Sequence, residues 1–240
     1  MNGAAGAWSG IVADPLLHLT VTLAAYGCAL WAYRRSGRNP LLNPVLISIA
    51  LVIAFLLITG TPYRTYFDGA RFIHFLLGPA TVALAIPLYR HFDLVRRSAP
   101  AIAVSLVAGS LTAASSAVLI GWLLGASPES LISLAPKSVT APVAMGITQV
   151  LGGIPSLTAG LVILTGILGA MTGTLVLRLT RVRGDAATGL AIGTASHGIG
   201  TARALQISDT AGAFSGLAMG LNALLTAIVL PIVWKIFAGG

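Results

Sequence analysis

The stretch ATGLAIGTASHGIGTARALQI (residues 187–207) is long and apolar enough to enter a membrane, which a helix of about 20 residues can cross. It also holds His197 and Arg203, although ionisable side chains are rare in membrane segments unless they face a partner or a cavity. Its glycines weaken a regular helix, and non-helical backbone at membrane depth persists only inside protein or beside water. We therefore predict that segment 186–207 is a broken or re-entrant element inside a membrane protein.

Seven other apolar segments account for most of the remaining chain. Of its 240 residues, 56% are hydrophobic and 8% are charged, against about 25% charged in ordinary soluble domains. This composition excludes a soluble globular enzyme and predicts an all-α polytopic membrane protein, with about six spanning helices and two broken or re-entrant segments. We expect a single membrane domain, 1–240, in which 1–97 hold the first three helices and 98–240 hold the core. The eight segments are 16–33, 44–60, 71–89, 102–125, 131–153, 155–179, 186–207 and 211–237.

Three short loops carry most of the positive charge. The net charge is +8, and nine arginines follow apolar segments in three clusters: Arg34, Arg35 and Arg38; Arg90, Arg96 and Arg97; Arg178, Arg181 and Arg183. Positive loops are typical of the cytoplasmic side, so we interpret the charge as topology and expect no nucleic-acid partner. Three apolar segments separate the second and third clusters. Three crossings would place these two clusters on opposite sides of the membrane, so we expect one of the segments to enter and leave on the same side. Segment 131–153 contains Pro136, Lys137 and Pro142, which break helices or carry charge, and we predict that it is broken or re-entrant.

The two predicted broken segments resemble each other. KSVTAPVAMGITQV (137–150) aligns with TASHGIGTARALQI (194–207), and each precedes a helix rich in small residues. One crossing separates the copies and inverts them, and inverted repeats with broken helices near the midplane are typical of secondary transporters. The alternative is that any two membrane segments rich in Gly, Ala and Thr align this well.

Three cations lie in these segments without a carboxylate inside the membrane to balance them. They are Lys137, His197 and Arg203, since every acidic residue falls at a predicted end or loop. We predict that a small anion, most simply a carboxylate, supplies the missing charge and binds neighbouring hydroxyl groups, while an asparagine braces the unwound backbone. The predicted substrate-binding set is Lys137, Ser138, Thr140, Thr194, Ser196, His197, Arg203 and Asn222.

Structural explanations of the same residues stay open. The long side chains of Lys137 and Arg203 could reach the membrane interface, and Arg203 could pair with Asp209. His197 could be a buried imidazole bonded to protein, and Asn222 could serve only hydrogen bonding between helices.

We expect no enzyme activity and no metal or cofactor site. Cys28 is the single cysteine, and the four histidines lack metal-ligand spacing. Gly198-Ile-Gly200 has neither the preceding strand nor the third glycine of a dinucleotide-binding loop.

Five stretches resemble the LrgB/CidB family, and the resemblance covers nearly the whole chain from about residue 16. They are Asn39–Pro44, Leu77–Val82, Lys137–Pro142, Gly193–Arg203 and Gly212–Asn222. The one departure is Ala223, where we expect glycine after the Leu-Asn pair. The resemblance implies two kinds of function. Bacterial members are described as holin-like or antiholin-like proteins that affect murein hydrolase export and autolysis, with a small LrgA/CidA-type partner. Plastidal relatives in plants are glycolate/glycerate transporters, and some bacterial relatives handle pyruvate.

Together these observations predict a secondary transporter of small monocarboxylates, of the glycolate, glycerate or pyruvate type, that works by alternating access. The alternative is an antiholin-like regulator of murein hydrolase export and autolysis. We expect a multi-pass protein of the bacterial inner (cytoplasmic) membrane, in contact with membrane lipid. We also expect a homo-oligomer and an LrgA/CidA-like partner subunit.

Overall fold

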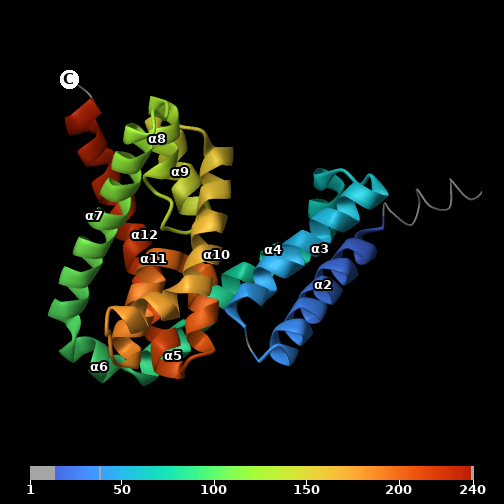
Figure 1. Cartoon of the computed structure of the whole chain (residues 1–240), viewed down its shortest axis with the longest axis horizontal. Helices are drawn as coiled ribbons and strands as arrows, with labels where there is room; N and C mark the ends of the chain where they lie inside the picture. The colour runs from blue at the N-terminus through green and yellow to red at the C-terminus, as the bar shows by residue number, and fades with distance from the viewer. Residues whose placement is uncertain (1–13, 38, 239–240) are drawn as a thin grey trace, which may run out of the picture. The chain divides into compact units, whose positions relative to one another are not determined.

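Helices make up the described architecture. The structure, a computed structural model, describes residues 14–37 and 39–238, and these ranges contain helices and no strands (Figure 1). Arg38 of the first arginine cluster lies outside the described residues. The chain divides into two compact units, Met1–Ala83 and Leu84–Gly240. A single domain with a division after residue 97 stays a prediction.

The described residues include five helices that are long and apolar enough to cross a membrane. These are Pro15–Arg35, Tyr63–Arg90, which is interrupted by a turn at Leu84, Ala99–Leu123, Pro155–Leu179 and Asp209–Ile236. Pro44–Thr59 is a further apolar helix but has only 16 residues. The other two predicted segments, 131–153 and 186–207, are the two that contain breaks. The prediction of an all-α polytopic membrane protein is confirmed.

Four helical elements form the described part of the first unit: α2 (Pro15–Arg35), the 3-10 helix η1 (Pro40–Leu42), α3 (Pro44–Thr59) and α4 (Tyr63–Ala83). Asp14 caps α2 and Asn43 caps α3, because each accepts a hydrogen bond from the backbone NH two residues on. α2 packs against both α3 and α4. Where α2 meets α4, the hydroxyls of Thr22 and Tyr66 lie 2.8 Å apart.

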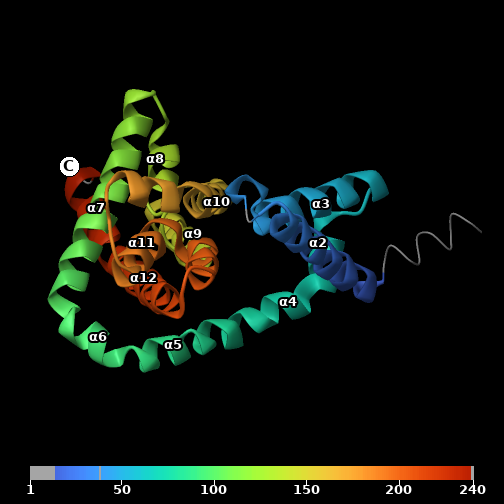
Figure 2. The same cartoon turned by 60° about the horizontal axis from the view of Figure 1, so that its bottom comes forward.

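The second unit holds every residue of the predicted site. Its described helices are α5 (Ala85–Arg90), α6 (Phe92–Arg97), α7 (Ala99–Leu123), α8 (Pro128–Leu134), α9 (Ala141–Leu151), α10 (Pro155–Leu179), α11 (Asp185–Leu205) and α12 (Asp209–Ala238). The short α5 and α6 curve the chain into α7 (Figure 2). α7, α10 and α12 are the long helices, and the two broken segments lie between them.

The first of these broken segments folds as a helical hairpin, which we call hairpin 1. It consists of α8, residues 135–140 outside either helix, and α9. Its arms run in opposite directions: Ala135 packs with Ile147, and further from the tip the NH of Ile154 donates to Ser133 Oγ at 2.8 Å. The chain therefore leaves hairpin 1 at the end where it entered, which is the shape that a re-entrant segment requires.

α11 also folds back on itself, and we call it hairpin 2. His197 has φ 40° and ψ −135°, which lie outside the helical region, so the helix turns there. Gly193 on the first arm and Thr201 on the return arm lie equally far from this turn, and both meet Ser215 on α12. The chain therefore leaves hairpin 2 at the end where it entered, and this shape fits the re-entrant form of the prediction better than a crossing in two halves.

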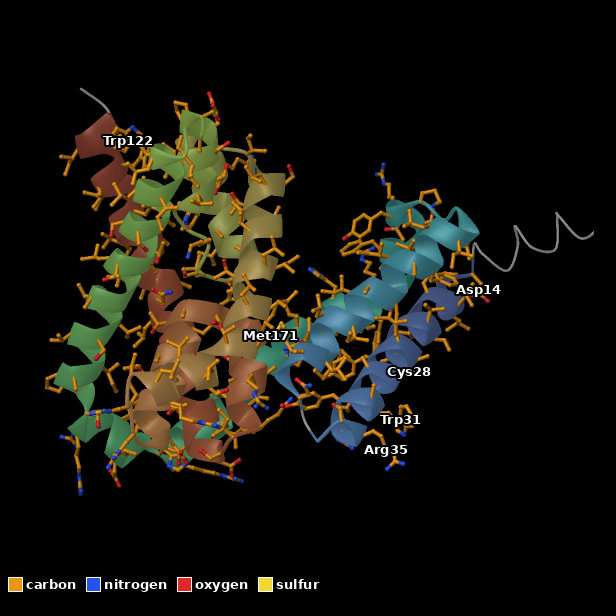
Figure 3. The ribbon with its side chains drawn as sticks, viewed as in Figure 1. Asp14, Cys28, Trp31, Arg35, Trp122 and Met171 are labelled. Carbon is orange, nitrogen blue, oxygen red and sulfur yellow. The ribbon has the colours of Figure 1, made fainter. Side chains whose placement is uncertain are left out.

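The two hairpins enter the second unit from opposite ends. His91 Nε2 lies 3.5 Å from Thr210 Oγ1, and Val95 and Ala186 pack on one apolar cluster. The second and third arginine clusters therefore lie together, at what we call the arginine end, with the base of hairpin 2. Figure 1 shows α8 and α9 at the other end of the unit, where Figure 3 labels Trp122. Tryptophan is enriched at membrane interfaces.

Two long helices each pass both hairpins, in opposite order. Along α10, Val162 packs with Val139 of hairpin 1, and Gly173 near the other end lies against Ile192 of hairpin 2. Along α12, hairpin 2 comes first, and Leu230 later packs with the arms of hairpin 1. Hairpin 1 with α10 and hairpin 2 with α12 thus run in opposite senses, which agrees with an inverted repeat. It also puts the end of α12 opposite the arginine end.

Candidate substrate site at the tips of two hairpins

Asn222 on α12 joins the tips of the two hairpins. Its Nδ2 donates to the carbonyl oxygen of Ser138 in hairpin 1 at 3.4 Å and to that of Thr194 in hairpin 2 at 3.0 Å. Asn222 is 1% exposed, and the other two residues are also buried. One side chain therefore satisfies the freed backbone of both broken segments.

Two polar atoms at this junction are left over. Asn222 Oδ1 and Ser138 Oγ are buried and accept or donate no hydrogen bond within residues 14–37 and 39–238. A buried polar group without a partner costs about 1–3 kcal/mol, and in native proteins such groups often meet a water, an ion or a ligand. The junction therefore has one hydroxyl that can donate and one amide oxygen that can only accept.

His197 sits at the turn of hairpin 2 and is 5% exposed. Its Nε2 lies 2.9 Å from the carbonyl oxygen of Val162 on α10. A carbonyl only accepts, so Nε2 carries a proton, and in the neutral ring Nδ1 is an acceptor. Gly166 makes this approach possible, because a Cβ there would lie 2.7 Å from His197 Cε1. Since Val162 also packs with Val139, it contacts both tips.

Hydroxyl groups hold the rest of this turn. Thr201 Oγ1 donates to the carbonyl of His197 at 2.9 Å and lies 2.9 Å from Ser215 Oγ. Ser196 is buried against Gly169 of α10. Thr194 Oγ1 donates to Leu190 of its own arm at 2.8 Å, so this hydroxyl already has a partner.

Lys137 and Thr140 lie in the tip of hairpin 1 and are half-buried. Among the residues that the structure describes, the Lys137 side chain forms no hydrogen bond or ion pair. Thr140 precedes the first turn of α9, but its hydroxyl makes no capping bond. Both side chains therefore have polar groups available beside Ser138.

Arg203 lies in a different setting, at the base of hairpin 2. It lines an open pocket together with Thr174, Arg178 and Thr188, and none of the other predicted site residues lines this pocket. Its Nη1 donates to Gln206 Oε1 at 3.1 Å. The structure thus brings Ser138, Thr194 and Asn222 into contact and puts His197 and Ser196 at the adjoining turn. It does not bring Arg203 to the junction, and the roles of all these residues in binding remain predictions.

The predicted site residues include none from α10, although Val162 of this helix contacts both hairpin tips. Val162 offers only a backbone carbonyl, which no side-chain pattern marks. Gly166 and Gly169 do carry a signal, because with Gly173 they form a small-residue face at helical spacing. That spacing indicates close helix packing, and the helix that fits there is hairpin 2.

Comparison with known families identifies the chain. The model of the LrgB-like family matches residues 22–236, which is most of the sequence. This chain belongs to the LrgB-like family. The resemblance to this family that the sequence motifs indicated is therefore confirmed.

Several relatives of the LrgB-like protein are similar over nearly their full length. It is 36% identical over 216 residues to the Bacillus subtilis (strain 168) protein named uncharacterized protein YwbG, covering 90% of this chain and 96% of the relative. It is 34% identical over 222 residues to holin-like protein CidB of Staphylococcus aureus (strain Mu50), covering 92% and 96%. It is also 34% identical over 199 residues to holin-like protein CidB of Staphylococcus epidermidis (strain ATCC 12228), covering 83% and 87%. No solved structure matches the chain.

Proposed function

We propose that this LrgB-like protein is a secondary transporter that moves a small monocarboxylate of the glycolate, glycerate or pyruvate type by alternating access. The observation that carries the proposal is the Asn222 amide, which bonds the carbonyls of Ser138 and Thr194 where two oppositely oriented hairpins meet. Discontinuous membrane elements that meet near the midplane are the substrate sites of many secondary transporters. A pore that needs only associating apolar helices gives no reason for this buried polar junction.

The charges at the junction favour an anion. α9 begins at the tip of hairpin 1, and the return arm of hairpin 2 begins at His197, so two helix N-termini with partial positive charge face the junction. Lys137 adds a full positive charge. α8 and the first arm of hairpin 2 end there with partial negative charge, and Lys137 also offsets the end of α8. The net effect is an electropositive junction.

The two unpartnered atoms favour a hydroxy acid within this class. Ser138 Oγ can donate to a carboxylate oxygen, while Asn222 Oδ1 can only accept and so needs a donor on the ligand. A hydroxyl beside the carboxylate, as in glycolate and glycerate, supplies that donor, whereas a keto group does not. Thr140 and Ser196 complete the proposed contacts to the anion, and Lys137 attracts the carboxylate. Thr194 Oγ1 donates to Leu190, so its proposed contact is to accept from the ligand hydroxyl.

His197 is proposed as a substrate contact or as the carrier of a coupled proton. Its Nε2 is bonded to Val162, so Nδ1 is the atom that can accept a proton or a substrate hydroxyl. One form of this proposal is an exporter of another anion that is coupled to protons. In this form the His197 imidazole is required for flux. In that case a pH gradient drives flux through the wild type and does not drive it through His197→Ala.

The second candidate is a holin-like or antiholin-like protein that regulates murein hydrolase export and autolysis. The names of the Staphylococcus relatives support this candidate more directly than they support transport. Under either proposal the protein acts in the bacterial inner membrane, as a homo-oligomer, with an LrgA/CidA-like subunit as partner and without enzyme activity.

Purified protein in liposomes separates the two candidates. Counterflow of radiolabelled glycolate, glycerate or pyruvate is expected from a transporter, with glycolate and glycerate preferred over pyruvate. Leakage of dyes regardless of their charge is expected from a holin-like pore. Dye leakage without counterflow of any of the three acids would contradict the transport proposal.

A further inference from the structure

The base of hairpin 2 has a pocket that the proposed transport site does not use. It is an open pocket of about 310 Å³ between the end of α10 and both arms of hairpin 2. Its polar lining consists of Thr174 and Arg178 from α10 and Thr188 and Arg203 from hairpin 2. One small pocket thus collects two guanidinium groups and two hydroxyl groups from three separate helical segments.

The side chains that line this pocket carry a net positive charge. The described lining residues include two arginines and no aspartate or glutamate, and Arg178 forms no ion pair within the described part of the chain. The hydrogen bond from Arg203 Nη1 to Gln206 Oε1 at 3.1 Å fixes its guanidinium to its own helix turn. Guanidinium forks match the planar or tetrahedral oxygen pairs of carboxylate and phosphate groups. An oxyanion held between the two arginines would offset their mutual repulsion.

The surroundings of the pocket favour a lipid as the source of that oxyanion. Leu175, Leu179 and Leu205 beside it are exposed apolar side chains, with Leu179 at 73%. The pocket also lies at the arginine end, which the positive loops indicate as cytoplasmic. Basic pockets between membrane helices on this side are suited to anionic lipid head groups. We propose that the pocket binds the phosphate of an anionic phospholipid, whose acyl chains lie along exposed α10.

Such a lipid would tie the end of α10 to the return arm of hairpin 2. Arg178 belongs to the first of these elements and Arg203 to the second. Bound lipid would therefore stabilise the hairpin at its base, far from the tip at His197. This inference does not depend on transport, because it concerns only the folded protein and its lipid.

The test measures the melting temperature of the full-length protein in detergent with added phosphatidylglycerol, phosphatidylcholine or inorganic phosphate. We expect phosphatidylglycerol alone to raise Tm of the wild type and of Arg183→Gln, which removes a neighbouring arginine outside the pocket. We expect the rise to disappear in Arg178→Gln and in Arg203→Gln, and to persist in Arg178→Lys. Native mass spectrometry of the same samples counts bound phosphatidylglycerol even if a variant is less stable.

Each alternative result overturns part of the proposal. An equal rise in Arg178→Gln and the wild type would remove the lipid from this pocket. An equal rise with phosphatidylcholine would contradict recognition of anionic charge. A rise with inorganic phosphate and none with phosphatidylglycerol would assign the pocket to a free oxyanion instead of a lipid.

Discussion

Hairpins 1 and 2 reach the same junction with different backbone solutions. In hairpin 1, residues 135–140 are not helical. Pro136 lies at the start of this break, and Pro142 lies in the first turn of the helix that follows it. Hairpin 2 turns at the single residue His197, which has a positive φ of 40° although it is not glycine. Such a conformation costs about 1–3 kcal/mol and persists only where surrounding packing imposes it. The first break is therefore encoded locally, and the second depends on α10 and α12.

The largest expected effect on folding comes from a methyl group placed where hairpin 2 meets α12. In Gly193→Ala the new Cβ would lie 2.8 Å from the Cα of Ser215, so backbone has to move. Overpacking of this kind typically costs about 1–3 kcal/mol, and here no flexible side chain can yield. We expect loss of the monodisperse peak in size-exclusion chromatography, or a clearly lower Tm.

The matched control for that substitution lies in hairpin 1. A Cβ at Gly146 meets nothing within 4 Å, so Gly146→Ala should keep or slightly raise Tm. Equal stability of the two alanine variants would contradict the dependence of hairpin 2 on close packing.

The next effect concerns charge at the two hairpins. Lys137→Ala should lower carboxylate counterflow about 10-fold or more, because a hydrogen bond to a charged group contributes about 1.5–3 kcal/mol. Lys137→Arg should retain part of the flux. Arg203→Ala should cause a smaller loss, since Arg203 lies in the pocket at the base of hairpin 2. Unchanged flux in Lys137→Ala would refute its role at the carboxylate.

The bridge between the hairpins should contribute a smaller, measurable stability. Asn222→Ala adds no volume at this buried position and leaves the carbonyls of Ser138 and Thr194 without their donor. The expected cost is about 1–3 kcal/mol, seen as a lower Tm. Thr172→Val is the control, because this exposed hydroxyl bonds only to Leu168 of its own helix. A Tm drop no greater than that of the control would show that the bridge adds little.

The smallest effect is a difference in stability between glycine and alanine variants. Alanine is the more stable residue within a helix, and we expect the opposite at His197. At His197 glycine accepts the positive φ and alanine does not, so His197→Gly should be more stable than His197→Ala by about 1 kcal/mol. At Ala195, an exposed position in the first arm, alanine should exceed glycine by a similar amount. Thermal unfolding of the four proteins measures both differences. Alanine favoured over glycine at both positions would mean that hairpin 2 does not turn at His197.

Sequence patterns predicted those features of the fold that depend on residues close together in the chain. Hydropathy predicted the membrane segments, and the arginine clusters with Pro136 predicted that 131–153 returns to its own side. The turn at His197 was predicted only as a break that either crosses or re-enters. No residue marks the choice, because contacts such as Gly193 with Ser215 make it.

The candidate site divides in the same way. Asn222 was predicted to brace unwound backbone, and the structure shows its amide bonded to the carbonyls of Ser138 and Thr194. The hydroxyls of these two residues were predicted because they flank the cations, and their contact with an anion stays a prediction. Arg203 was grouped with them by charge alone. Its pocket with Arg178 could not be predicted, since the two residues are neighbours only after hairpin 2 folds back on α10.

Cysteine crosslinking tests most directly whether the two tips meet around an anion. In a Cys28→Ser background, which removes the single native cysteine, the pair Ser138→Cys and Thr194→Cys is treated with a short bifunctional thiol reagent in membranes. The account predicts rapid crosslinking that glycolate slows and chloride at equal ionic strength does not. It also predicts no crosslinking of Ser138→Cys with Thr172→Cys. Failure of the first pair to crosslink in folded protein, or equal protection by chloride, would contradict the account.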